Sequence, residues 1–452
     1  MSDVAVRQII NVSDLIEAAP ISAAQHRIIA LCGILALLDG FDTQAIAFVA
    51  PVLTAQWRID LALLGPVFAA GLAGLMIGAL AFGPAADRIG RKPALILSTL
   101  IFGIFASATA FVTSTHELLA LRFLTGIGLG GAMPNIIALT SEYAPRRARA
   151  TAISLMFCGF PLGAVLGGLL ATWMIPRWGW SSVFLLGGGA PLATVPILMW
   201  MMPESARFAV LRKRSQSGVL ATLAAIAPHI DIARATLEVG EQPAGGFPLK
   251  HLFSERRHFK TVLLWIVFFA SLLLLYFLVN WLPSLLHRSG LPLQLAIVAT
   301  VVLNAGGIVG AVVLGWLIDR FSPTWILAAA CALAASATAA LGPLSSTTPG
   351  LLAFVFVGGF GVIGAQICMN AVAAAIYPTA IRSTGVGWAL GVGRLGSLVG
   401  PVVGGMLIAG GFTIDEVFLC AALIALAACA ALIGLRTAIG LAYVEGPARA
   451  SH

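Results

Sequence analysis

Apolar residues in this chain fall into long runs separated by short polar segments. A helix needs about 20 predominantly apolar residues to cross the hydrocarbon core of a bilayer, and twelve runs are long enough to do so. We therefore predict twelve membrane-spanning helices. Their ranges are 27–52, 62–85, 94–113, 117–141, 150–173, 183–202, 260–283, 294–318, 324–343, 349–376, 383–410 and 413–436.

One long polar segment, residues 203–260, separates six runs from the other six. This predicts an all-α membrane protein built of two pseudo-symmetric six-helix bundles, residues 27–202 and 261–437. The segment between them is predicted to be a cytoplasmic linker. Residues 1–26 and 438–452 are predicted to be cytoplasmic terminal segments.

The overall composition agrees with a membrane protein. The chain is 60% hydrophobic and 10% charged, with a mean hydropathy of +1.00, which excludes a soluble globular protein of this length. All six cysteines lie inside the apolar runs and none forms a C-x-x-C pair. We expect free thiols that pack as small hydrophobic residues, without disulfides or metal sites.

The net charge of +8 does not indicate a nucleic-acid-binding protein, because the basic residues follow the predicted membrane topology. Of the 26 Lys and Arg residues, 21 fall in the termini and loops on the side that includes the N-terminus, and three fall on the opposite side. Basic residues are concentrated on the cytoplasmic side of membrane proteins. The distribution therefore predicts that both termini are cytoplasmic.

Two carboxylates interrupt the first apolar run. Each of Asp39 and Asp42 costs roughly 2.5–3.5 kcal/mol at the centre of a bilayer on insertion scales. Their spacing of three places both on one face of a helix. Such a face must be turned toward protein or an internal cavity, so we expect the two acids to border a cavity.

Two arginines also lie deep inside predicted spans. Arg122 opens a run of small residues that includes Gly126 and Gly130, and small residues at four-residue steps let membrane helices approach closely. Arg394 lies about midway along its run, where snorkelling to the interface is difficult. We expect the acids, Arg122 and Arg394 to converge from the two bundles on one water-accessible pocket, although snorkelling remains an alternative for Arg122.

Uncharged polar residues in the second bundle are further candidates for the pocket wall. Tyr276 and Asn280 are four residues apart on one helix, as are Gln366 and Asn370 on another. An aromatic face with polar tips suits a planar ligand, but such faces also pack against lipid. Buried amides in membrane helices commonly link helices to one another, so both interpretations stay open for the amides.

The loop after the second run contains glycines, an acid and bases that suit a tight turn at the inner membrane surface. We predict a structural gate formed by Gly83, Asp87, Arg88, Gly90 and Arg91. A solvated turn that follows the charge rule is the alternative.

The end of the eighth run repeats this pattern in part. Asp319 and Arg320 follow a glycine at the spacing that precedes Asp87 and Arg88, but the Gly-Arg-Lys that should come next is absent. We interpret Asp319 and Arg320 as a degraded second copy of the same gate.

These motifs together resemble the major facilitator superfamily and, within it, the aromatic acid:proton symporter family. The resemblance covers essentially the whole chain. It depends on the loop from Gly83 to Lys92 and the glycine run after Arg122, and on the motifs Asp39-Gly40-Phe41-Asp42, Pro203-Glu204-Ser205-Ala206-Arg207 and Tyr377-Pro378-Thr379-Ala380-Ile381-Arg382-Ser383-Thr384-Gly385.

The resemblance implies a proton-coupled transporter, not an enzyme, that imports aromatic carboxylates by alternating access of the two bundles. It also implies a monomer in the bacterial cytoplasmic membrane, driven by the proton gradient without a bound cofactor. Hydroxybenzoate or protocatechuate is the first expectation for the substrate, followed by benzoate, gentisate or a phenylpropanoate.

The residues suggest how these roles are divided. A carboxylate ligand needs a cation, and Arg394 can donate two parallel hydrogen bonds. Proton coupling needs a group that gains and loses charge, which arginine cannot do. We therefore expect Asp39 or Asp42 to carry the proton, with Arg122 governing its release. Arg394 is expected to hold the substrate, with help from the side chains of Tyr276, Asn280, Gln366 and Asn370.

Other functions remain to be weighed. Proton-linked export of organic acids or drugs would use the same fold, and Arg394 argues only against a cationic cargo. An intramembrane enzyme would need a metal cluster or an acid–base–nucleophile set in the spans, and no H-E-x-x-H, deep histidine or G-x-S-x-G is present. A receptor would usually add a soluble output domain, whereas the predicted tails are short.

Overall fold

The computed structural model describes residues 9–212, 217–226, 236–238, 253, 258–318, 320–341, 347–376 and 382–444. Some side chains within this part are not described, those of Asn370 and Arg382 among them. Asp319 and residues 377–381 of the Tyr-Pro-Thr motif lie outside the described residues.

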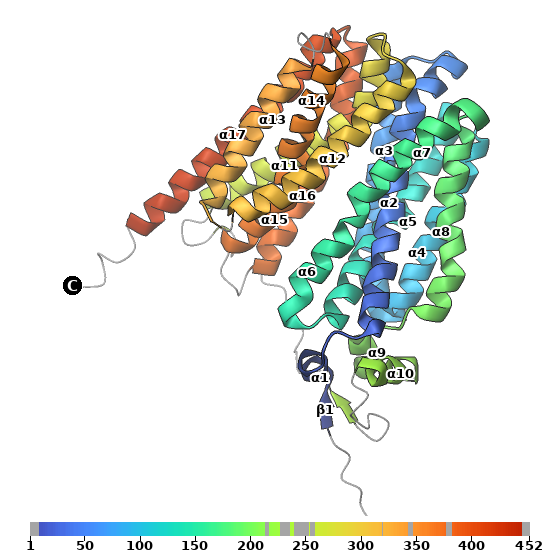
Figure 1. The fold of residues 1–452 in the computed structure, drawn as a ribbon, viewed down its shortest axis with the longest axis vertical. Helices are drawn as coiled ribbons and strands as arrows, with labels where there is room; N and C mark the ends of the chain where they lie inside the picture. Colours follow the sequence, from blue (N-terminus) through green and yellow to red (C-terminus); the bar gives the residue numbers. More distant parts are fainter. Residues whose placement is uncertain are drawn as a thin grey trace, which may run out of the picture. The chain divides into compact units, whose positions relative to one another are not determined.

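Helices dominate the first part of the chain (Figure 1). In order, its elements are β1 (Ile9–Asn11), α1 (Val12–Ala18), α2 (Ala23–Trp57), a 3-10 turn (Leu61–Leu63), α3 (Leu64–Ile89), α4 (Arg91–Ala108), a second 3-10 turn (Thr109–Phe111), α5 (Thr115–Tyr143), α6 (Arg146–Phe157), α7 (Gly159–Trp178), α8 (Ser181–Met201), α9 (Ala206–Arg212), α10 (Ser217–Ile226) and β2 (Thr236–Glu238).

The remaining elements are also helical. They are α11 (His258–Arg288), α12 (Leu293–Ile318), α13 (Pro323–Ala340), α14 (Thr348–Gly359), a π-helical turn η5 (Phe360–Gly364), α15 (Ala365–Ile376), α16 (Arg382–Ala409) and α17 (Ile414–Val444).

The prediction of twelve spanning helices is confirmed. Among the described residues, twelve helical segments are long and apolar enough to cross a membrane, and each coincides with one predicted run. The structure adds two interruptions that the apolar pattern did not indicate. The fifth segment breaks at Cys158, between α6 and α7, and the tenth contains η5.

The chain forms two compact units. The first comprises Met1–Thr43, Ala70–Ala164 and Ser181–Ala244, and the second comprises Gln44–Ala69, Val165–Trp180 and Gly245–His452. Unit borders therefore fall inside α2, α3 and α7. The division into six-helix bundles at the polar linker is a different partition and stays a prediction.

Glycines permit close helix packing in the first unit. A Cβ added at Gly163 of α7 would collide with the backbone of Leu37 of α2, and one at Gly40 would collide with the backbone of Phe160. On α5, Gly126 and Gly130 approach the backbone of α3 in the same way. Such contacts bring backbones together, as small residues do in membrane helices.

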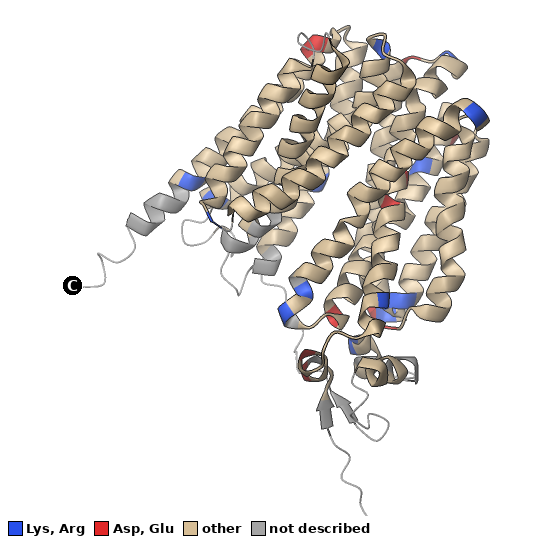
Figure 2. Cartoon of the chain, viewed as in Figure 1, with Lys and Arg blue, Asp and Glu red and all other residues tan. Residues whose placement is uncertain are grey.

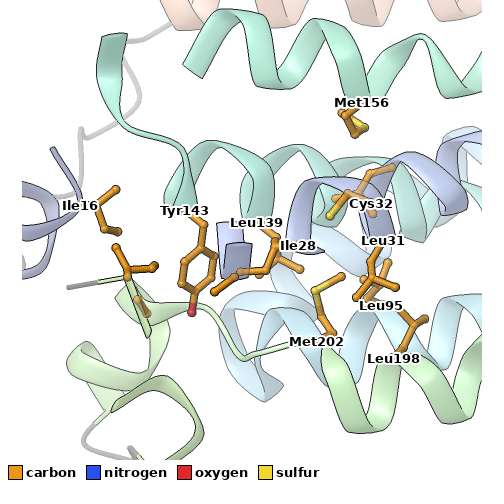
Figure 3. Close-up of a cluster of buried hydrophobic side chains, with 14 of the residues drawn as sticks. Ile16, Ile28, Leu31, Cys32, Leu95, Leu139, Tyr143, Met156, Leu198 and Met202 are labelled. Carbon is orange, nitrogen blue, oxygen red and sulfur yellow. The ribbon is translucent and has the colours of Figure 1, made fainter. Parts of the chain in front are cut away.

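This unit contains a cluster of buried apolar side chains (Figure 3). Ile28 and Cys32 of α2, Leu139 and Tyr143 of α5, and Met202 are part of it. Ile16 of α1 and Leu223 of α10 join the same cluster, and β1 pairs in parallel with β2. Segments before α2 and after α8 are therefore packed against helices of this unit.

The second unit joins the ends of α2, α3 and α7 to C-terminal helices. Phe68 of α3 lies edge-to-face on Trp281 of α11, with 5.2 Å between ring centroids. Gly168 of α7 faces Val301 of α12. Spans from the two predicted bundles are thus in direct contact within this unit.

Charged residues lie mainly at helix ends, and most of the helical length carries none (Figure 2). Arg88, Arg91, Lys92 and Arg147 all lie at the ends of α3, α4 and α6. This distribution is expected for helices whose middle sections lie in hydrocarbon.

Candidate functional site

The first unit contains a buried ion pair. Nη1 of Arg122 on α5 donates to Oδ2 of Asp42 on α2 at 3.1 Å, and the two side chains are only 4% and 1% exposed. Nη2 of Arg122 donates to the hydroxyl oxygens of Thr109 at 3.1 Å and Thr125 at 3.2 Å. The Arg122 guanidinium also lies 4.9 Å from the ring centroid of Phe184.

We refer to Asp42, Arg122, Thr109 and Thr125 as the acid–arginine cluster. Two of its hydrogen-bonding atoms have no partner among the described residues. Oδ1 of Asp42 and Nε of Arg122 are buried and have no hydrogen-bond partner in the described part of the chain. A Cβ added at Gly187 of α8 would lie 3.6 Å from Oδ1 of Asp42. The same Cβ would lie only 3.0 Å from the ring of Phe41, so glycine at position 187 lets α8 pack closely beside Asp42.

Asp39 has surroundings different from those of Asp42. It is buried, and its Oδ1 accepts a hydrogen bond from Oγ1 of Thr43 at 3.2 Å. The ion pair of Arg122 is formed with Asp42. Of the two acids predicted to border the cavity, the structure thus joins Asp42 directly to Arg122.

Arg394 forms a second polar centre, in the second unit. Its Nη1 lies 3.4 Å from the hydroxyl oxygen of Tyr276 on α11. The side chain is half-buried, and no carboxylate among the described residues lies within ion-pair distance. Nothing lies within 4 Å of a Cβ added at Gly387 or Gly391, so the helix that carries Arg394 has open space beside it.

The side-chain amides predicted to line the pocket differ in their hydrogen bonds. Nδ2 of Asn280 donates to the backbone carbonyl of Tyr276 at 2.7 Å, so its amide is used within α11. Gln366 is 8% exposed, and its buried Oε1 has no hydrogen-bond partner in the described structure. Asn370 lies on α15, and its side chain is outside the described residues.

Another amide pair was not predicted. Nε2 of Gln44 donates to Oδ1 of Asn304 at 3.0 Å, and Nδ2 of Asn304 donates to Oε1 of Gln44 at 3.1 Å. Both residues are buried in the second unit. The bonds link α2 to α12, across 260 residues of sequence.

The predicted gate loop is organised by Glu204. Gly90 has a φ of 108°, a conformation that favours glycine. Immediately after it, the backbone N–H groups of Arg91 and Lys92 donate to Oε1 of Glu204 at 2.8 and 3.1 Å. A carboxylate at a helix N-terminus satisfies free donors and complements the helix dipole.

The same region holds an ion pair at the end of α5. Nε of Arg91 donates to Oε1 of Glu142 at 2.9 Å, and the hydroxyl of Ser205 donates to Oε2 of Glu142. The hydroxyl of Tyr143 donates to the backbone carbonyl of Glu204. We refer to Arg91, Glu142, Tyr143, Glu204 and Ser205 as the helix-end cluster.

The other predicted gate residues lie at the surface or outside the described part. Asp87 and Arg88 are exposed, and nothing lies within 4 Å of a Cβ added at Gly83. Arg320 lies over the ring of Trp316, with 3.9 Å from Cζ to the centroid. Asp319 is outside the described residues.

Sequence reasoning did not select Glu142 and Glu204 as functional residues. Glu204 belongs to the Pro-Glu-Ser-Ala-Arg motif, so a signal was present. Glu142 lies at the end of a span, beside a predicted basic loop. An acid near several bases at the inner surface was the signal that could have identified it.

No metal centre accompanies these clusters in the part of the chain that the structure describes. No group of three or more His, Cys, Asp or Glu side chains there could hold a metal ion. All six cysteines are free thiols.

Comparisons with known proteins agree with the helical architecture. A family model described as Major Facilitator Superfamily matches residues 32–393 and 297–444. The gallate transporter of Pseudomonas putida is 42% identical over 94% of each chain. The 4-hydroxybenzoate transporter PcaK of Pseudomonas aeruginosa is 41% identical over 94% of this chain and 95% of its own.

Solved structures share the fold at low sequence identity. An inward-facing bacterial homologue of the human lysosomal transporter Spinster matches with a TM-score of 0.70 and 18% identity, over 94% of this chain and 97% of its own. A D-xylose–proton symporter matches with a TM-score of 0.68 and 18% identity, over 90% and 97%.

Proposed function

Because this chain belongs to the major facilitator superfamily of membrane transporters, we propose that it imports aromatic carboxylates together with protons by alternating access. The proposal includes the bacterial cytoplasmic membrane as its location, a monomeric state and cytoplasmic termini. Relatives named as gallate and 4-hydroxybenzoate transporters support the aromatic acid as cargo.

Arg394 is the observation that carries the proposal. It is a half-buried cation on a membrane helix, beside open space and a tyrosine hydroxyl, with no carboxylate counter-ion among the described residues. A guanidinium inside a membrane needs an anion or hydrogen-bond acceptors. A substrate carboxylate supplies both, and arginine can bind it with two parallel hydrogen bonds.

The acid–arginine cluster is proposed to carry the proton. Asp42 can gain a proton, whereas Arg122 stays charged at all accessible pH values. Protonation of Asp42 would remove the buried counter-charge of Arg122 and release its hydrogen bond. The two threonine hydroxyls that Arg122 already contacts would then remain as its partners.

Asp39 is the alternative proton carrier. Asp39 is buried and accepts a hydrogen bond from Thr43 one helical turn away, whereas Asp42 forms the ion pair with Arg122. We therefore assign the coupling role to Asp42 first and to Asp39 second.

The test is uptake of radiolabelled 4-hydroxybenzoate into proteoliposomes that contain the purified protein. An inward proton gradient should drive accumulation above the external concentration, and collapse of the gradient should abolish it. Arg394→Ala should abolish saturable uptake. Accumulation that is unaffected by the gradient would contradict proton coupling.

Export of organic acids is the second candidate function. It uses the same residues and differs only in the direction of net transport. Whole cells that express the protein should gain labelled 4-hydroxybenzoate faster than cells without it. Faster loss of label from preloaded cells, with no faster gain, would favour export.

A further inference from the structure

We infer that Gln366 selects for aromatic acids that carry a ring hydroxyl, because its buried amide oxygen needs a hydrogen-bond donor that an unsubstituted ring cannot supply. This inference rests on the proposed function and adds a requirement on the substrate ring. Arg394 binds the carboxylate that all aromatic acids share, so it cannot distinguish between them.

The position of Gln366 in α15 brings it to the depth of Arg394. Met369, one turn after Gln366, lies in one buried cluster with Phe268 of α11 and Ala389 of α16. Gln366 lies ten residues before the end of α15 at Ile376, and Arg394 lies twelve residues after the start of α16 at Arg382. At a rise of 1.5 Å per residue they are therefore about 15 Å and about 18 Å from these ends.

Both displacements point toward the same end of the bundle. The helices α15 and α16 are consecutive and antiparallel, so going back along α15 and forward along α16 leads away from the ends nearest residues 376 and 382. Tyr276, which contacts Arg394, lies beyond Phe268 in the same direction on α11. Gln366 therefore lies near the level of the Arg394–Tyr276 pair.

The local backbone is unusual at this point. The π-helical turn η5 ends at Gly364, two residues before Gln366. Such turns are rare in proteins and occur frequently at functional sites. The turn changes the rotational register of the helix, which sets the direction in which Gln366 points.

The chemistry of the unpaired atom defines the ligand. Oε1 of Gln366 is an acceptor, and it has no donor in the described part of the chain. A carboxylate anion and an aromatic ring offer no O–H or N–H group, whereas a phenolic hydroxyl donates one hydrogen bond. A ring that carries this hydroxyl can satisfy the amide oxygen, whereas a ring without it leaves the oxygen unpaired, which is unfavourable for a buried acceptor.

The test compares two ligands and two proteins. Affinities of 4-hydroxybenzoate and 4-methoxybenzoate are measured by competition against labelled substrate in proteoliposomes. The methoxy group keeps the oxygen but has no hydrogen to donate. Wild type should prefer the hydroxy acid by about 10-fold or more, on the scale of one hydrogen bond to a buried group.

Gln366→Met keeps the length of the side chain and removes the amide. It should abolish most of the preference for the hydroxy acid and leave binding of the methoxy acid little changed. Ile367→Leu, at the exposed neighbouring position, is the matched control and should keep the wild-type preference. Thermal melting of each purified variant checks that it is folded.

The outcomes separate this inference from the proposed function. Equal affinities in wild type, or an equal loss for both ligands in Gln366→Met, would overturn the role of Gln366 while transport of aromatic acids stands. If wild type bound neither ligand, the proposed function would fail and the inference with it.

Discussion

At the scale of single residues, burial of the Asp42–Arg122 ion pair inside the protein carries a desolvation cost in free energy. Moving two charges out of water costs several kcal/mol for each ion, and the attraction between them repays this only with good geometry. Here one carboxylate oxygen and one guanidinium nitrogen stay without partners. Such incomplete satisfaction fits a pair that must break and re-form.

This arrangement leads to a prediction for Asp42→Asn. The amide cannot take up or release a proton in the accessible pH range, but it can still accept a hydrogen bond from Arg122. We expect proton-driven accumulation to be lost and exchange of labelled for unlabelled substrate to persist. The measurement is proteoliposome uptake with a gradient, followed by counterflow without one.

Two comparisons make the Asp42→Asn result specific. Asp39→Asn should retain part of the gradient-driven accumulation if Asp42 is the main proton carrier. Arg122→Ala should instead destabilise the protein by about 3–5 kcal/mol, because it leaves a buried carboxylate without its counter-ion. Normal accumulation by Asp42→Asn would show that the proton is carried elsewhere.

At the scale of helices, stability depends on the close approach of glycines to neighbouring backbones. A methyl group at Gly163 would collide with the backbone of Leu37, and overpacking of this kind typically costs about 1–3 kcal/mol. We predict that Gly163→Ala lowers the melting temperature of the detergent-purified protein.

The matched control is Gly189→Ala, in α8. Nothing lies within 4 Å of a Cβ added at Gly189. Alanine is favoured over glycine in a helix by about 0.5–1 kcal/mol, so this variant should melt at the same temperature or slightly higher. If both substitutions lowered the melting temperature equally, close packing at Gly163 would have no specific effect on stability.

The helix-end cluster gives a second prediction at this scale. Glu204 accepts hydrogen bonds from the first backbone N–H groups of α4. Loss of a helix cap costs about 0.5–2 kcal/mol, so Glu204→Ala should lower thermal stability, whereas Glu204→Gln should lose less because it keeps an acceptor oxygen. Equal melting temperatures for wild type and Glu204→Ala would contradict this role.

The sequence predicted the spans well because a 20-residue apolar run has few alternatives in a bilayer. The apolar pattern alone did not indicate the break at Cys158 or the π-helical turn at Phe360–Gly364, since it continues through both. The spacing of three residues correctly suggested that Asp39 and Asp42 lie on the same side of one helix. Only three-dimensional packing could identify Asp42 as the partner of Arg122 and Glu142 as the partner of Arg91.

At the scale of the whole molecule, the proposed alternating access requires that contacts between spans from the two predicted bundles break at one stage of the cycle. The reciprocal amide pair between Gln44 and Asn304 is such a contact, since the two residues belong to the first and the eighth spans. Gln44 also lies two residues after Asp42 on α2. Movement of this part of α2 would therefore affect both the amide pair and the proposed proton site.

We predict that a covalent link between positions 44 and 304 stops transport. The experiment introduces Gln44→Cys and Asn304→Cys into a background without the six native cysteines, and joins the pair with a short bis-methanethiosulfonate. Uptake and counterflow should both fall to background after cross-linking and return after reduction. Each single-cysteine variant, treated in the same way, should keep transporting because it cannot form the link. Full transport by a completely cross-linked protein would mean that α2 and α12 move together throughout the cycle, and the contact would then be a fixed part of the scaffold instead of a closure that opens.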